Sequence, residues 1–252
     1  MAEWLAAGLA GGAGLVGGAM NALAGGGSFA TMPTLIALGL PSTHANATSN
    51  VAVEPGAIAS AWAYRDGLTP LSGVGVRTLA AITFTGGLAG SLLLVLTPPS
   101  AFDVIVPWLL LAATIAIALG RRAADWLHSR FAAGPRTLVA GQALLGIYGG
   151  YFGGGIGMML TAMWGLLTGK EPAELAALRT LMLATANAAA TLVFVATGMV
   201  GWALGVPMMV GSIAGGYLGA LLGKRLSPGV IRGWTLLVTI VTTIVFFWRA
   251  YH

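Results

Sequence analysis

The chain has 252 residues, of which 57% are hydrophobic and only 8% are charged, and its formal net charge is +5. Soluble domains carry about 25% charged residues, so this composition excludes a water-soluble globular protein and indicates a lipid environment. The absence of cysteine excludes disulfides, thiol catalysis and thiolate metal sites. The basic residues are scattered at the ends of apolar runs and form no single patch, so we expect no binding to nucleic acid.

Successive apolar runs predict an all-α integral membrane protein, a polytopic helical bundle of roughly eight to ten membrane segments. Two runs, 29–40 and 156–168, are too short to cross a hydrocarbon core of about 30 Å comfortably. Each follows a glycine triplet, which predicts a broken or re-entrant short helix. The runs cover residues 4–23, 29–40, 45–63, 74–96, 104–120, 137–152, 156–168, 174–196, 202–222 and 233–249.

The same pattern of glycines and prolines occurs twice along the chain. Gly25–Gly27 corresponds to Gly153–Gly155 at a spacing of 128 (153 minus 25), and Pro99 corresponds to Pro228 at a spacing of 129 (228 minus 99). A chain that repeats itself once, with glycines inside membrane-length apolar runs, has the layout of a duplicated transporter. We expect a first membrane repeat over residues 1–120, a cytoplasmic linker over 121–136 and a second membrane repeat over 137–252.

Lysine and arginine mark the cytoplasmic side of a membrane protein. The stretch 121–136 contains four arginines, the loop 223–232 contains three basic residues, and Arg65 and Arg77 flank a third loop, so these loops should face the cytoplasm. Loops 97–103 and 197–201 carry no lysine or arginine and should face outward. Corresponding loops of the two halves then face opposite sides, which predicts inverted-topology repeats with both termini outside.

The glycine triplets are candidates for an anion site. Three glycines interrupt a helix and free backbone N–H groups at the next helix start, where the helix dipole attracts anions; the alternative is that they only allow close helix packing. Arg179 lies about two turns into a predicted membrane helix and suits an oxyanion, although it could instead reach lipid headgroups. The expected substrate-binding residues are Gly26, Gly27, Ser28, Asn46, Thr48, Ser49, Asn50, Gly154, Gly155, Arg179, Thr180 and Asn187.

Glu54 lies in the middle of a predicted membrane segment, directly before Pro55. It is either a residue that couples transport to protons or a carboxylate hydrogen-bonded to backbone freed by the proline, and the sequence leaves both interpretations open. His44 follows a turn and is expected at the outer interface. The sequence contains no hydrolase, zinc-protease or P-loop motif, so we expect no enzymatic activity, no cofactor and no metal site.

The glycine-rich stretch GGGSFATMPTLIALGLPSTHANATSN and its echo GGYFGGGIGMMLTAMWGLLTG, with Thr48-Ser49 answered by Arg179-Thr180, are similar to the pattern of a known family. Over residues 8–248 the chain resembles the sulfite exporter TauE/SafE family of bacterial inner-membrane permeases. This resemblance implies transport of sulfite, an organosulfonate or a related small anion. The sequence departs from the pattern at Asn50 and Glu54, which are more polar than expected, and at Thr161, where a proline is missing.

Residues and resemblance together predict a transporter that binds a small anion between its halves and exposes it alternately to each side, coupled to an ion or a proton. A passive anion channel and a permease for a small carboxylate remain alternatives. A cation permease would need more membrane-embedded acids, and an intramembrane enzyme or scaffold would not need duplicated broken helices. The expected partners are the anion and the lipid bilayer, and the sequence leaves a homodimer open.

Overall fold

The structure is a computed structural model that describes residues 2–128, 134–223 and 226–251. Within these ranges the chain is helical apart from its connections and one isolated β-bridge between Leu71 and Val74, which confirms the all-α prediction. The helices are α1 (Glu3–Ala24), α2 (Ser28–Ala37), α3 (Ser42–Ala63), the 3-10 helix η1 (Arg65–Gly67), α4 (Val76–Leu96), α5 (Pro99–His128), α6 (Pro135–Tyr151), α7 (Ile156–Thr168), α8 (Ala176–Ala196), α9 (Trp202–Gly223) and α10 (Pro228–Tyr251).

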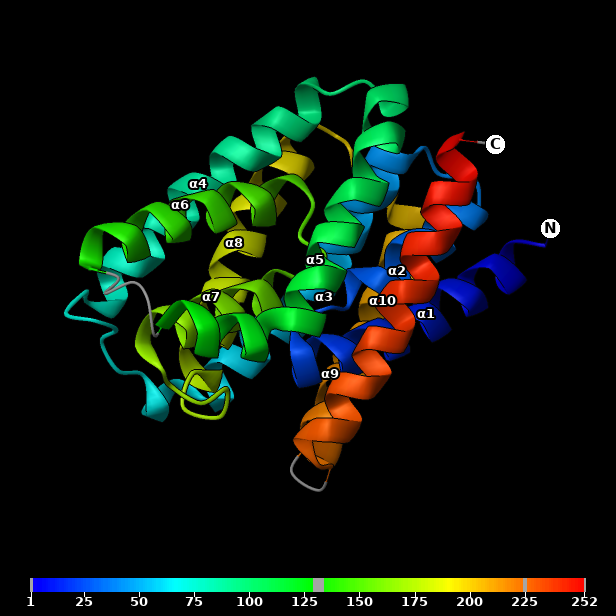
Figure 1. Ribbon diagram of the computed structural model, residues 1–252. Helices are drawn as coiled ribbons and strands as arrows, with labels where there is room; N and C mark the ends of the chain where they lie inside the picture. The colour runs from blue at the N-terminus through cyan, green and yellow to red at the C-terminus, as the bar shows by residue number, and fades with distance from the viewer. Residues whose placement is uncertain (1, 129–133, 224–225, 252) are drawn as a thin grey trace.

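Helices of the first half of the chain pack against helices of the second half (Figure 1). On one flank α1 packs along α9, and on the other flank α6 packs along α4. The middle of the molecule holds α3 against α8, with α5 and α7 packed together beside them. Each flank therefore combines one helix of the first half with one of the second.

Glycines allow these helix pairs to approach closely. A methyl group added at Gly14 or Gly18 of α1 would collide with the backbone of α9, and one added at Gly150 of α6 would collide with the backbone of Gly87 on α4. Small residues serve this purpose in membrane helices, where no water drives apolar surfaces together. The packing interpretation of the glycines is thus confirmed for the long helices.

The surface and the helix lengths identify a multi-pass membrane protein. Among the described residues, six helices are long and apolar enough to cross a membrane, namely α1, α4, α5, α8, α9 and α10. Large apolar side chains such as Leu96, Leu144 and Val210 are exposed on these flanks, as a lipid solvent permits. The remaining long helix, α3, is more polar and lies in the centre with most of its side chains buried.

The predicted helix breaks occur at both glycine triplets. Helix α1 ends at Gly25, whose φ of 76° is left-handed, and α2 then has only 10 residues. Gly153 and Gly155 have φ of 74° and 75° before α7, which has 13 residues. At about 1.5 Å per residue, α2 and α7 are roughly 15 and 20 Å long, shorter than a bilayer core.

The loops gather at two opposite ends of the molecule. At one end, the Gly201 end, the backbone N–H of Gly201 donates to Thr48 Oγ1 (2.9 Å), and Ser42 Oγ donates to the Pro99 carbonyl (3.5 Å). Figure 1 shows both chain termini at this end. At the other end, the Tyr64 end, η1 packs against the start of α8. A methyl group added at Gly67 would lie only 3.2 Å from Ala177 Cβ.

Basic residues concentrate at the Tyr64 end. The described ones in its loops and helix starts are Arg65, Arg77, Arg136, Lys170 and Arg232. The described loops of the Gly201 end, 38–41, 97–98 and 197–201, contain no lysine or arginine. Helix α5 continues through residues 121–128 of the predicted linker. The predicted cytoplasmic residues Arg130, Lys224 and Arg225 lie outside the described residues.

Candidate functional site

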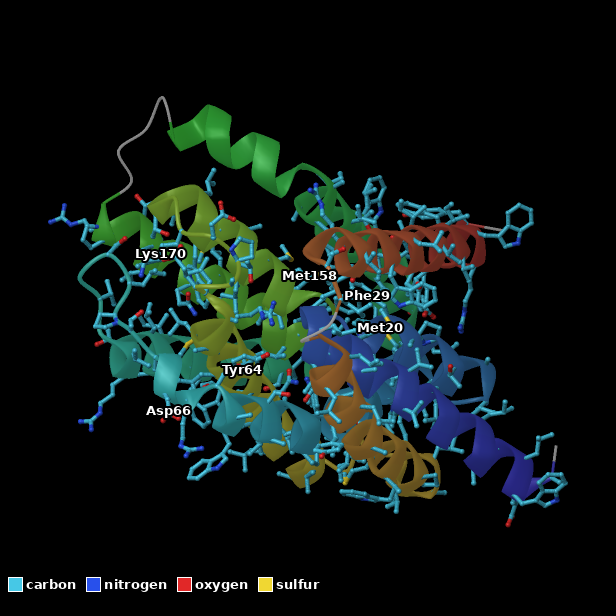
Figure 2. The ribbon with its side chains drawn as sticks, turned by 90° about the horizontal axis from the view of Figure 1, so that it is seen from below. Met20, Phe29, Tyr64, Asp66, Met158 and Lys170 are labelled. Carbon is cyan, nitrogen blue, oxygen red and sulfur yellow. The ribbon has the colours of Figure 1, made fainter. Side chains whose placement is uncertain are left out.

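The two glycine breaks touch each other in the middle of the molecule. A Cβ atom added at Gly25 would lie 2.8 Å from Gly157 Cα, and one added at Gly157 would lie 3.0 Å from Gly25 Cα. Side chains pack reciprocally around this contact, since Met158 reaches Gly26 and Phe29 reaches Gly155. Figure 2 shows Phe29 and Met158 close together near Met20, away from Tyr64 and Asp66.

The predicted glycine positions are held by local hydrogen bonds. The Gly27 N–H donates to Asn21 Oδ1 (3.5 Å), and its carbonyl accepts a bond from Thr31 Oγ1 (3.2 Å). The Gly154 carbonyl accepts a bond from the Tyr148 hydroxyl (2.6 Å). These bonds satisfy backbone groups that the missing helical turns leave open.

Arg179 lies beside the contact between the breaks. A Cβ on Gly157 would be 3.5 Å from Arg179 Cγ, so this side chain starts next to the beginning of α7. Arg179 is half-buried, and its guanidinium makes no hydrogen bond or ion pair with any described residue. The phenol of Tyr64 is within electrostatic range of it. An arginine in a membrane helix with no protein counter-ion is suited to an anionic ligand.

A pocket of about 360 Å³ opens at the Tyr64 end. Its lining comes from the end of α3, from η1 and from the start of α8. Ala176 and Ala177 of the lining are one turn or less from Arg179, and Tyr64 joins the pocket to that side chain. Asp66 and Glu174 contribute carboxylates to the pocket, and Figure 2 shows Asp66 near Tyr64.

A row of buried polar side chains runs along α3 where this helix meets α8 and the second glycine break. Asn46 Nδ2 donates to the Tyr151 carbonyl (3.0 Å), and Asn50 Nδ2 donates to Asn187 Oδ1 (3.3 Å). Asn46 Oδ1 is buried and unbonded. Asn46 and Asn50 are four residues apart and share one face of the helix. This row joins α3 of the first half to elements of the second half.

Glu54 continues the row by one more turn. Its side chain is 5% exposed, and neither carboxyl oxygen has a hydrogen-bond partner among the described residues. The Asn187 amide acts on it from α8 without forming a bond of good geometry. Pro55 lies inside a continuous α3, and no backbone N–H donates to Glu54, so the interpretation of Glu54 as a partner of freed backbone is not supported.

Other expected site residues face structural partners. Thr48 Oγ1 binds the Gly201 N–H, and Thr180 Oγ1 donates to the carbonyls of Ala176 and Ala177 in its own helix. Ser49 Oγ pairs with Thr31 Oγ1 at 2.5 Å and joins α3 to α2. The buried Ser28 makes no hydrogen bond with a described side chain or loop group. His44 is partly exposed near the Gly201 end, with a buried, unbonded Nδ1.

Two residues at the site were not expected from the sequence. Gly157 forms the contact with Gly25, and its position in GGGIG was the available signal. Tyr64 follows the apolar run of α3, and nothing in its neighbourhood distinguishes it from an interfacial aromatic residue. Its role depends on η1 folding back against α8, which is a tertiary contact.

The architecture is that of a membrane transporter: helices of the two halves packed in pairs, two interrupted helices meeting at the centre, and beside them an arginine without an ion pair among the residues that the structure describes. The sequence matches the family described as "Sulfite exporter TauE/SafE" over residues 10–246. The chain belongs to this family, and the resemblance noted from the glycine motifs is confirmed.

Relatives carry transporter names. The chain is 31% identical over 214 residues to "Probable membrane transporter protein YfcA" of Escherichia coli (strain K12), covering 84% of this chain and 77% of that protein. It is 27% identical to a "Probable membrane transporter protein" of Haemophilus influenzae, with 91% and 90% of the two chains covered. "Probable membrane transporter protein ORF9" of Sinorhizobium sp is 26% identical, with 92% and 88% covered. No solved structure shows a significant match to this chain.

Proposed function

We propose that this membrane transporter carries a small oxyanion, either sulfite or an organosulfonate. The observation that carries the proposal is the unpaired guanidinium of Arg179 beside the crossing of Gly25 and Gly157. A cation in a membrane helix needs a counter-ion, and an oxyanion supplies one with acceptor oxygens that match the guanidinium fork. The first turn of α7 adds the positive end of a helix dipole at the same place.

We assign the neutral part of the site to polar groups around the same contact. Ser28 at the start of α2 and the backbone N–H groups of Gly26 and Gly155 make no hydrogen bond with a described loop or side-chain group, so these donors are available to an oxyanion. The pocket at the Tyr64 end supports entry from that side, because it ends one turn or less from Arg179. Thr48 and Thr180 contribute less to anion binding, since their hydroxyls already form hydrogen bonds with backbone groups.

Alternating access is the mechanism that the pairing of helices favours. By their order in the chain, α1 corresponds to α6 and α4 corresponds to α9, so the contact between α1 and α9 is matched by the contact between α6 and α4, which supports two repeats of opposite orientation. In the described conformation Gly25 and Gly157 are in contact, so substrate cannot pass between the breaks. Transport then requires the two halves to move relative to each other, which an open channel does not require.

The charge distribution supports one orientation in a bacterial inner membrane. The Tyr64 end, which holds Arg65, Arg77 and Arg136, would face the cytoplasm. The Gly201 end and both termini would face the periplasm. The pocket is then open to the cytoplasm. Cysteines introduced singly at Ser72 and Gly198 and probed with a membrane-impermeant thiol reagent would test this orientation.

Anion binding to purified protein tests the proposed function. Sulfite, methanesulfonate, sulfate and acetate are added separately, and the midpoint of thermal unfolding is recorded. We expect the sulfur oxyanions to stabilise the protein, because a ligand that binds only the folded state raises its stability. Stabilisation by acetate alone would favour the carboxylate permease, and stabilisation by none of them would contradict an anion transporter.

Arg179→Ala should weaken binding of the stabilising anion by about 10- to 100-fold, the range expected for hydrogen bonds to a charged group. Arg179→Lys should recover part of this affinity, because the charge remains and the fork is lost. The matched control is Arg77→Ala, which removes an exposed cation at the same end. Unchanged affinity in Arg179→Ala, measured by titration calorimetry, would remove this residue from the site.

A further inference from the structure

Glu54 is a buried carboxyl group that forms no hydrogen bond with any residue that the structure describes. It lies in the middle of α3, is 5% exposed, and leaves both oxygens without a hydrogen bond among the described residues. In the polar row, Asn187 Oδ1 accepts from Asn50 and Asn50 Oδ1 accepts from Thr191 (3.4 Å), while the Asn187 amide nitrogen faces Glu54 without forming a hydrogen bond of good geometry. Glu54 therefore differs from the other side chains of the row, most of which form hydrogen bonds.

An ionised carboxylate in such a place is strongly unfavourable, so its charge must be neutralised. A divalent cation such as Mg²⁺ or Ca²⁺ would need several oxygen ligands, usually with more than one carboxylate. The described residues contain no cluster of three acidic or histidine side chains that could hold a metal ion. A proton neutralises the carboxylate without any further ligand, which suits a carboxyl group that has no hydrogen-bond partner among the described residues.

No charged side chain that the structure describes on the surrounding helices pairs with Glu54. Helix α8 contributes Arg179, η1 contributes Arg65 and Asp66, and α5 and α1 contribute Asp103 and Glu3 near the Gly201 end. None of these forms an ion pair with Glu54. The described parts of α2 and α9 have no charged residue, and Tyr217 of α9 is exposed; Tyr148 and Tyr151 lie on the neighbouring α6.

We propose that Glu54 binds the proton that this transporter moves together with its anion. The inference rests on the proposed function and names its coupling ion. Asn187, which faces Glu54, lies eight residues after Arg179 on α8, or about 12 Å along the helix. If the anion at Arg179 and the carboxyl at Asn187 are about 12 Å apart, a charged Glu54 weakens anion binding about tenfold at an intermediate dielectric. Anion and proton therefore favour each other's binding, which is the linkage that cotransport in one direction needs.

A hydrophobic carbodiimide tests the protonation of Glu54 directly. The carboxyl O–H adds across one C=N bond of the reagent, its proton moves to that nitrogen, and the O-acylisourea rearranges to a stable N-acylurea. We expect mass spectrometry to find this adduct on Glu54 in purified protein at neutral pH, and the rate should fall as the pH rises. The control Asp103→Asn should label equally. Absence of the adduct, or a rate independent of pH, would show that the group is not a proton-binding site.

Transport in proteoliposomes tests the coupling. Methanesulfonate is the probe, because its sulfonate stays ionised and carries no proton of its own. The wild type should exchange labelled methanesulfonate and accumulate it about tenfold for each unit of imposed pH gradient at one-to-one stoichiometry. Glu54→Gln should keep exchange and lose gradient-driven accumulation, whereas Asp103→Asn should keep both.

The outcomes separate this inference from the proposed function. Gradient-driven accumulation in Glu54→Gln at the wild-type level would overturn the assignment of Glu54 while leaving anion transport intact. No exchange in the wild type would contradict the transport of sulfonates, and carbodiimide labelling would still decide whether Glu54 binds a proton. Labelling uses the wild-type protein, so it also decides the question if Glu54→Gln fails to fold.

Discussion

Replacing Gly25 with alanine tests the contact between the two breaks. Gly25 has a left-handed φ of 76°, and an added methyl would lie 2.8 Å from Gly157 Cα. The left-handed backbone costs an alanine about 1–2 kcal/mol. The collision with backbone atoms, which cannot rotate away, adds about 1–3 kcal/mol. We therefore expect Gly25→Ala to lower the free energy of unfolding by about 2–5 kcal/mol.

Gly198→Ala is the matched control. Gly198 has a similar φ of 71°, but a methyl there meets no atom within 4 Å. In this variant the free energy of unfolding should fall only by the cost of a left-handed alanine, about 1–2 kcal/mol. Thermal unfolding in detergent at a fixed heating rate compares the two, and each kcal/mol lowers the midpoint by about 2–4 °C in a chain of this size. Equal losses in both variants would show that the breaks do not press against each other.

Two further substitutions test buried polar bonds. Gln142→Leu removes the acceptor of the Trp164 indole N–H (2.9 Å) and should lower stability by about 1–3 kcal/mol. The double variant with Trp164→Phe should recover part of this loss, and a larger loss would contradict the explanation. Alanine at Asn50 and at Asn187, singly and together, should reveal a coupling energy of about 0.5–1.5 kcal/mol by thermal unfolding. Strictly additive losses would indicate that these amides do not bond.

The interrupted helices could be predicted because their cause is local. Gly25 and Gly153 are left-handed in the structure, and glycine adopts that conformation without steric cost. The run 156–168 is observed as α7 with the same bounds, and the run 29–40 as the shorter α2. Helix α10 starts five residues earlier than expected because Pro228 is well suited to a first helical position.

The partners of the polar residues could not be predicted, because each bond joins distant parts of the chain. Thr48 was expected to face the substrate and instead binds the Gly201 N–H. Asn46 was expected among the substrate-binding residues, and its side-chain amide donates to the Tyr151 carbonyl, 105 residues away in the chain. Composition placed these side chains in the same region, but only the crossing of α3 with α8 and α9 determines which way each one points.

The central place of α3 has a consequence for biogenesis. This helix is too polar to be counted among the apolar spans, and its shielding comes from α8 and α9, which are synthesised more than 100 residues later. Until they emerge, Asn50 and Glu54 would have to face lipid without protection. We therefore expect the insertion of α3 to be completed late, once the carboxyl-terminal half is available to cover it.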